Sequence, residues 1–313
     1  MLVDCHVHVC ACTPGHGSMS PRLLNSIAFR FMRWRLGIPG YGEETERAIE
    51  RKLIETIDAS PIDAAVVLAF DAVYVGDGVT DHANTHLYVT NDYVIELANR
   101  HRKVLFGCSV HPYRKDALPE LERCAAAGAV LCKWLPITQG MDPADERCLP
   151  FYEALAHLKL PLLCHTGGEQ SLPRVDDSLA DPMLLEPALK RGVTVIMAHC
   201  GTRSKPGERD YVPQFVRLAE QYENCYGDTS ALNLPARWYG LDVIRKNKAV
   251  SVKLVHGSDW PIISLPSPTR VGWGESWEAM GERNWMARDV MIKQRLGFDG
   301  EYWQRAGKVL GRA

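Results

Sequence analysis

The sequence predicts a closed barrel of eight parallel strands surrounded by helices, a (β/α)8 fold. Short apolar, β-rich runs recur along the chain, and most are separated by segments with a helical pattern. Apolar strands that alternate with helices are typical of buried parallel strands in βαβ units. Eight such units within about 250 residues fit a closed barrel better than an open sheet. The runs span residues 1–7, 64–70, 103–110, 129–135, 160–166, 193–200, 224–230 and 250–259.

Helix-forming segments fill most of the intervals between these strands. Gly128 and Gly192 each stand just before a strand, where a glycine commonly ends the preceding helix. Two further helices are expected after the last strand, around residues 276–296 and 301–311. We therefore expect residues 1–313 to form a single barrel domain with additional C-terminal helices. The expected helices between strands include residues 43–59, 91–102, 118–128 and 150–159.

Two segments do not fit the strand–helix repeat. Residues 13–42 form an insertion after the first strand and combine turns with a basic, aromatic helix, and residues 260–275 form a loop rich in proline and tryptophan. Both follow the carboxyl ends of strands, where barrel enzymes carry their active sites. Long loops at this position usually cover the substrate. For the aromatic side chains of the insertion, simple packing of an added helix is equally compatible with the sequence.

Composition excludes several classes of protein. The chain has 313 residues, is 46% hydrophobic and 24% charged, and carries a net charge of −2, which is typical of a globular protein and argues against a nucleic-acid binder. Apolar runs of about 18 residues are absent, so no membrane span is expected. The N-terminal residues lack the features of a signal peptide, and we expect a cytoplasmic protein. Most of the ten cysteines lie in apolar runs and are predicted to be reduced.

Polar residues at the strand ends point to a metal site. Side chains two apart on a strand share a face, so His6 and His8 lie side by side, an arrangement that suits a metal ion. The later candidates recur at intervals of 32, 34 and 60 residues, and one repeat of a barrel is about 30 residues. All of them are therefore expected at one end of the barrel. The complete set is His6, His8, Lys133, His165, His199 and Asp259.

Each of these residues also has a purely structural interpretation. A single histidine at a strand end is usually a hydrogen-bonded structural residue, and a single aspartate often caps the next helix. A lysine inside an apolar strand is harder to explain structurally, because burying an unpaired ammonium group is costly. Taken together and in register with the repeat, the six residues favour a metal centre.

The residues around these ligands resemble a known family. The series of HxH, lysine, histidine, histidine and aspartate is similar to that of the amidohydrolase superfamily, whose members are TIM barrels. The phrases "DCHVH" (4–8), "CHTGG" (164–168), "AHCGT" (198–202) and "HGSDWP" (256–261) resemble its amidohydrolase-2 branch. The resemblance extends over nearly the whole chain. It implies a metal-dependent enzyme, either a hydrolase or a decarboxylase of small carboxylated compounds.

In the binuclear arrangement that the resemblance implies, His6, His8 and Asp259 hold one ion, while His165 and His199 hold a second. Lys133 forms a carbamate that bridges the two ions. A metal-activated hydroxide then attacks an amide, ester, lactone or related bond, with Asp259 as the proton acceptor. We favour this hydrolase because the decarboxylases of the branch do not generally need a lysine on the fourth strand.

In the mononuclear alternative, one ion is held by His6, His8, His165 and Asp259. His199 then serves as the acid or base, and Lys133 remains an ammonium group that binds a substrate carboxylate. This version implies decarboxylation of an aromatic or unsaturated carboxylic acid. The ligands accept zinc, which we favour, and also manganese, cobalt or iron. A non-catalytic scaffold on a decayed barrel would be expected to lack a ligand, and none is missing.

Other residues at the same end are candidates for substrate binding. Arg203 follows the sixth strand closely and could bind a carboxylate, and Glu169 lies near His165 in the sequence. The remaining candidates, which could equally be packing or capping residues, are His111, Trp134 and Trp260. The expected partner is a small-molecule substrate, without nucleic acid or membrane, and the resemblance also allows a homodimer.

Overall fold

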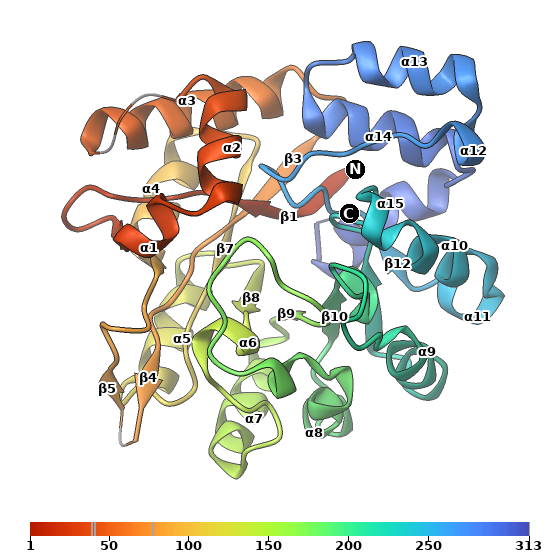
Figure 1. Cartoon of the computed structure of the whole chain (residues 1–313). Helices are drawn as coiled ribbons and strands as arrows, with labels where there is room; N and C mark the ends of the chain where they lie inside the picture. The colour runs from red at the N-terminus through yellow and green to blue at the C-terminus, as the bar shows by residue number, and fades with distance from the viewer. Residues whose placement is uncertain (39, 41, 77, 313) are drawn as a thin grey trace.

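The computed structural model describes residues 1–38, 40, 42–76 and 78–312 and contains the predicted barrel (Figure 1). Eight strands form one sheet, and each consecutive pair in it is parallel. All eight lie where the apolar runs predicted them. In the order of the sheet they are β1 (Val3–His8), β3 (Ala64–Leu68), β7 (Val104–Cys108), β8 (Leu131–Trp134), β9 (Leu162–His165), β10 (Val195–Ala198), β11 (Cys225–Asp228) and β12 (Leu254–Val255).

The barrel closes where the segment after β12 meets β1. The Cys5 amide donates to the His256 carbonyl at 3.0 Å, the Asp259 amide donates to the His6 carbonyl at 2.9 Å, and the His8 amide donates to the Trp260 carbonyl at 2.8 Å. These bonds lie along the strand that carries the two histidines. Closure of the barrel therefore fixes Asp259 beside His6 and His8.

Helices surround the barrel in Figure 1. The four helices that the sequence predicted between strands are confirmed within a few residues. Gly128 and Gly192 have φ angles of 90° and 80°, which a residue with a side chain rarely adopts, so both act as the helix ends that the sequence indicated. The surrounding helices are α3 (Glu43–Asp58), α4 (Asn91–Arg100), α5 (Ala117–Ala126), α6 (Pro136–Gln139), α7 (Leu149–Leu158), α8 (Glu186–Lys190), α9 (Val212–Gln221), α10 (Trp238–Lys246) and α11 (Lys248–Ser251).

The C-terminal region differs from its prediction. The prediction of a single helix over residues 276–296 was wrong, because the segment divides into α13 (Trp273–Gly281) and α14 (Trp285–Arg295). The side chain of Asn284 accepts hydrogen bonds from the amides of Met286 and Ala287, at 3.0 and 3.1 Å, and so begins a new helix. Along the chain, α12 (Pro268–Val271) precedes this pair and α15 (Gly300–Val309) follows it.

The insertion after β1 forms a small layer above the strand ends. It contains β2 (Gly17–Met19), α1 (Pro21–Leu24) and α2 (Ile27–Leu36), and the hydroxyls of Ser20 and Ser26 cap the two helices. Strand β2 pairs antiparallel with β6 (Leu87–Val89), which anchors the insertion to the segment after β3. A second small hairpin joins β4 (Tyr74–Val75) to β5 (Val79–Thr80).

A buried ion pair on α14 holds the loops that follow the last two strands. Lys293 and Asp289 are both fully buried and form an ion pair. The carboxylate of Asp289 also accepts from the Asn233 amide at 2.8 Å and from the Ser264 hydroxyl at 2.7 Å. Lys293 donates to the carbonyl of Gly257 at 2.8 Å, two residues before Asp259. The pair thereby supports the segment that carries a candidate ligand.

We expect Lys293→Met to destabilise the protein by about 3–5 kcal/mol, because it leaves a buried carboxylate without its cation. Urea unfolding of the metal-free protein measures this loss. Lys190→Met is the matched control, because its ion pair with Glu186 lies at the surface and should leave the unfolding midpoint almost unchanged. Equal midpoints for the two variants would contradict the structural role of the buried pair.

Two compositional expectations can be compared with the structure. All ten cysteines are free, as predicted. Among the residues that the structure describes, no helix is long and apolar enough to cross a bilayer.

Candidate metal centre

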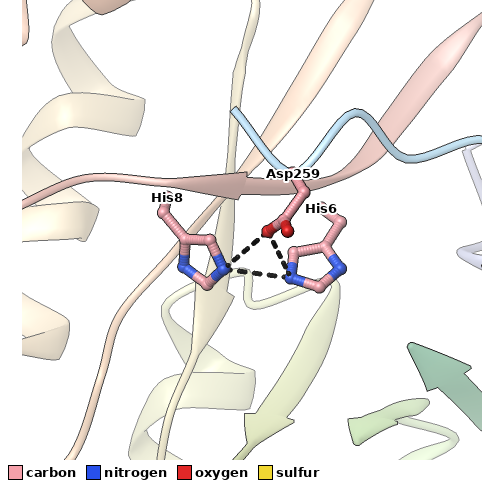
Figure 2. A group of neighbouring side chains, drawn as sticks. All are labelled: His6, His8 and Asp259. Carbon is pink, nitrogen blue, oxygen red and sulfur yellow. Dashed lines mark hydrogen bonds and ion pairs between the residues drawn. The ribbon is translucent and has the colours of Figure 1, made fainter. Parts of the chain in front are cut away.

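Three side chains from the barrel closure form a compact group (Figure 2). The Nε2 atoms of His6 and His8 are 3.0 Å apart, and Oδ1 of Asp259 lies 3.4 Å from the first and 3.2 Å from the second. Figure 2 shows both rings and the carboxylate directed toward one another beside β1. Two imidazole nitrogens and one carboxylate oxygen are a donor set that divalent transition metals prefer.

Two more histidines stand next to this group. His165 ends β9 and is buried, and neither of its ring nitrogens has a hydrogen-bond partner in the described part of the chain. Its ring centroid lies 4.8 Å from that of His199, which itself lies 5.3 Å from His6. Leaving a buried imidazole without partners is costly, so the free nitrogens of His165 fit the role of a metal ligand.

The backbone at two of these residues is unusual. His199 and Asp259 have φ angles of 60° and 64°, in the left-handed region that residues other than glycine rarely adopt. His199 follows β10 directly, and Asp259 is held by the closure bonds described above. Such conformations persist only where the surroundings enforce them, and they concentrate at functional sites.

Lys133 brings an amine into the same group. It points inward from β8, is 1% exposed, and its Nζ lies 3.1 Å from Nε2 of His6. Among the described residues, no carboxylate lies within ion-pair distance of this amine. Burial lowers the pKa of Lys133, although Asp228 and Asp259 oppose that effect. A larger fraction of this amine is therefore neutral and nucleophilic than for an exposed lysine.

Asp228 and Ser230 orient His6 and His199 through the Nδ1 atoms of their rings. Nδ1 of His6 lies 2.6 Å from Oδ2 of Asp228, and the Ser230 hydroxyl donates to Oδ1 of the same carboxylate at 2.6 Å. The Ser230 carbonyl lies 2.8 Å from Nδ1 of His199. Because these partners engage the Nδ1 atoms, the Nε2 atoms remain available to a metal. Burial lowers the pKa of both histidines well below its usual value, which keeps them in the neutral form that binds metal.

The hydrogen bond between His6 and Asp228 can be tested by mutation. Asp228→Asn should weaken metal affinity by roughly 10- to 100-fold, because an amide cannot fix the imidazole as a carboxylate does. Competition against a chromophoric chelator measures that affinity. Asp71→Asn is the control, since Asp71 is also buried but contacts Arg114 and the His111 amide instead. If both variants bind metal equally well, Asp228 does not orient the site.

A cavity of about 80 Å³ opens beside the cluster. The polar part of its lining comes from the candidate ligands, Glu169 and Ser171, and the rest is largely apolar. The insertion after β1 contributes part of this apolar wall, so it covers the site, as its position in the sequence indicated. The lining residues are His8, Cys10, Leu23, Phe29, Met32, Leu87, Leu135, His165, Glu169, Ser171, Leu172, His199, Asp259, Pro261 and Ile262.

Of the residues proposed for substrate binding, Glu169 lies in this lining. Its Oε2 is 3.7 Å from Nδ1 of His165, beyond hydrogen-bond distance, while Oε1 accepts from the Leu172 amide at 3.0 Å. Burial raises the pKa of Glu169. The residue is therefore placed where it can contact both a ligand histidine and a bound molecule.

The two tryptophans lie elsewhere. The indole of Trp134 is fully buried, donates to the Val110 carbonyl at 2.8 Å, and packs against Phe151 and Tyr152 of α7. Trp260 is 2% exposed and lines a different groove, between α2, α3 and the start of α14. Neither indole lies among the residues that line the cavity beside the cluster.

His111 and Arg203 also lie outside that lining. Nε2 of His111 is 3.1 Å from the Gln139 carbonyl, and burial lowers the pKa of His111 to about 4. The guanidinium of Arg203 stacks over the ring of Tyr239, at 4.5 Å from its centroid. Both side chains therefore make contacts within the fold and lie apart from the cavity lining.

Arg237 is a residue near the site that the sequence did not indicate. It is 5% exposed, and its guanidinium donates to the Gly168 carbonyl at 2.6 Å and to the Thr202 hydroxyl at 2.8 Å. These bonds join the segment after β9 to the segment after β10. Burial lowers the pKa of Arg237, whereas the negative charges of Glu169 and Asp259 raise it. The phrase "NLPARWYG" carries no signal that its arginine turns inward.

The fold and the site together define a parallel β/α barrel that carries, at the carboxyl ends of its strands, a cluster of histidines and one carboxylate that could bind a metal ion. The family model Amidohydro_2, described as Amidohydrolase, matches residues 3–283, and the chain belongs to this family. The family is metal-dependent, in agreement with the group formed by His6, His8 and Asp259. A sequence search of curated proteins finds no match.

Solved structures with the same fold extend over essentially the whole chain. An uncharacterized TIM-barrel protein from Bordetella bronchiseptica is 17% identical, with a TM-score of 0.66 and coverage of 99% of this chain and 98% of the other. A probable 2-pyrone-4,6-dicarboxylic acid hydrolase from Acinetobacter baumannii is 14% identical, with a TM-score of 0.60 and 99% of both chains covered. A 2,6-dihydroxybenzoate decarboxylase from Rhizobium is also 14% identical, with a TM-score of 0.56 and 99% of both chains covered.

Proposed function

We propose that the protein is a metal-dependent hydrolase that cleaves an amide, ester, lactone or related bond of a small carboxylated compound. The observation that carries this proposal is the position of Lys133, a buried amine 3.1 Å from a ligand nitrogen and without a carboxylate partner among the described residues. A lysine placed in this way suits conversion to a carbamate. The amine adds to carbon dioxide, forms a new N–C bond and releases one proton, and the resulting anion can bind two metal ions.

The chain provides two groups of ligands around this lysine. His6, His8 and Asp259 would hold one ion, and the unpartnered imidazole of His165 together with His199 would hold the other. Bound divalent ions would supply a water acidified from a pKa of about 15.7 to about 7 and would polarise the bond to be cleaved. Zinc is the metal we favour for this donor set, and manganese, cobalt and iron suit it as well.

Residues of the chain would accept the proton and determine which substrate fits the cavity. Burial alone would raise the pKa of Asp259, but the neighbouring imidazoles of His6 and His8 hold it below its usual value. Asp259 is therefore an ionised carboxylate that can accept a proton and transfer it to the leaving group. The apolar wall formed by Phe29, Met32 and their neighbours favours a substrate with a hydrocarbon body, and the cavity limits it to a small molecule.

A decarboxylase is the second candidate, and one observation favours it. The same apolar cavity would place an aromatic or unsaturated acid next to the ring of His199, whose Nε2 is not engaged by Ser230. In this arrangement His6, His8, His165 and Asp259 hold a single ion, and His199 donates the proton that replaces the lost carboxylate. Lys133 then remains an unmodified amine.

Metal content per chain, measured by elemental mass spectrometry, separates the two candidates. The protein is produced with zinc and bicarbonate and freed of loosely bound metal. We expect close to two ions per chain, and a carbamate signal in the ¹³C spectrum after labelling with ¹³C-bicarbonate that is lost in Lys133→Met. One ion per chain, no such signal and release of carbon dioxide from unsaturated acids would overturn the hydrolase and support the decarboxylase.

A further inference from the structure

Two helices of this protein expose large apolar side chains in stripes. On α2, Ile27, Phe31 and Trp34 are 88%, 44% and 73% exposed, and their spacing of four and three residues places them on one face of the helix. The opposite side of α2 is turned inward, since Phe29 is buried. Exposed apolar patches of this kind mark interaction surfaces.

Helix α13 carries a second stripe with the same spacing. Trp273, Trp277 and Met280 are 81%, 84% and 49% exposed, again four and three residues apart. Both helices lie in the upper part of Figure 1. The guanidinium of Arg35, on α2, lies 5.9 Å from the ring centroid of Trp285, which begins the helix after α13. The C-terminal end of α2 therefore lies beside the segment that joins α13 to α14.

The charges beside the two stripes are opposite. Arg30 and Arg35 flank the apolar residues of α2, and neither forms an ion pair with a described residue. Glu275 and Glu278 accompany the apolar residues of α13, where Glu278 makes a surface ion pair with Arg295 at 2.8 Å. A surface pair of this kind contributes little and can be exchanged for another. The basic residues beside the apolar stripe of α2 and the acidic residues beside that of α13 are therefore complementary in charge.

We propose that the protein forms a two-fold symmetric homodimer in which α2 of each copy packs against α13 of the other. A two-fold interface uses the same patch on both copies, so a contact of α2 with α13 occurs twice. The axis would pass through the groove between α2, α3 and the start of α14, which Arg35 and Leu36 line on one side and Glu282 and Arg283 on the other. Pairing α2 with α2 is disfavoured, because it would set Arg30 against its own copy.

The exposed area is close to what such a dimer requires. Aromatic side chains bury about 150–250 Å² each, so the four aromatic residues of the two stripes would contribute on the order of 500 Å² per copy. A standard interface buries about 800 Å² per partner, and the residues of the groove between α2, α3 and the start of α14 can contribute the remainder.

The dimer would also stabilise the cover of the metal site. Helix α2 directs Phe29 and Met32 into the lining of the cavity, while Ile27, Phe31 and Trp34 point away from it. A partner packed on the outer face of α2 would therefore hold its inner face in place over the cluster. This role lies beyond the proposed hydrolysis and does not depend on which reaction the site performs.

Sedimentation velocity on the full-length protein tests the interface. We expect a dimer for the wild type and monomers for Trp34→Glu and Trp277→Glu, because each places a charge in an apolar contact. Val243→Glu is the matched control, since Val243 is 51% exposed on α10, and it should remain dimeric. A monomeric wild type, or a dimer that persists in both tryptophan variants, would overturn the proposal.

A charge exchange tests which helices meet. Arg30→Glu and Glu278→Arg should each weaken the dimer by roughly tenfold, and the double variant should recover most of the lost affinity. Failure of the double variant to recover would overturn the pairing of α2 with α13. Vesicles of phosphatidylcholine with phosphatidylserine complete the test, because a monomeric wild type that binds them through Trp34 would identify a membrane surface as the partner instead.

Discussion

Asp259→Asn is expected to lower turnover by roughly 10²- to 10⁴-fold, the range for loss of a positioned proton acceptor. The carboxylate has two roles in the proposed mechanism, because its Oδ1 lies near both His6 and His8 and it also accepts the proton. Asparagine keeps the shape of the side chain but removes the negative charge and the basicity. The comparison therefore isolates the chemistry of the carboxylate from its packing.

Two measurements distinguish these roles. Metal content should fall below that of the wild type if Asp259 is a ligand, and kcat should stay low even at saturating metal if it also moves the proton. Asp71→Asn is the control, since Asp71 is also a buried carboxylate but does not line the cavity. Normal metal content together with normal kcat in Asp259→Asn would exclude both roles.

Much of this arrangement could be predicted from the sequence, because it depends on local pattern. The eight strands are continuous apolar runs, and the candidate ligands stand at their ends in register with the repeat. The break between α13 and α14 was missed because the helical pattern continues through it, and only the capping bonds of Asn284 reveal the new start.

The outward direction of the Trp134 side chain could have been predicted from the sequence. Neighbouring residues on a strand face opposite sides, so an inward Lys133 requires Trp134 to point toward the helices, where it packs against α7. Arg237 offered no comparable signal, because its contacts with Gly168 and Thr202 join segments that are far apart in the chain. Contacts of this kind arise only once the barrel has closed.

Lys133→Met is expected to abolish hydrolysis and yet to stabilise the metal-free protein by about 1–4 kcal/mol. The amine of Lys133 is buried without a carboxylate partner, so a methionine of similar length removes a costly polar group and fills the same space. Lys293→Met should have the opposite effect, because that lysine does have a buried carboxylate partner in Asp289. Urea unfolding of the two metal-free variants measures both effects.

The pH dependence of this gain follows from the direction of the pKa shift. Burial lowers the pKa of Lys133 below its ordinary value of 10.5, so the unfolded chain binds this proton more tightly than the folded chain does. The penalty is complete below the folded pKa and disappears as the pH rises through the ordinary value. The stability advantage of Lys133→Met should accordingly be largest below the folded pKa and shrink as the pH rises toward 10.5.

The activity of two variants separates a catalytic role of Lys133 from a structural one. Lys133→Ala opens space beside the ligands, and short carboxylic acids added to the solution should restore part of its turnover, since their carboxylate can take the place of the carbamate. Lys133→Met leaves no such space and should not respond. A metal-free protein that loses stability in Lys133→Met, or a methionine variant that keeps its turnover, would show that this buried amine serves the fold and not the reaction.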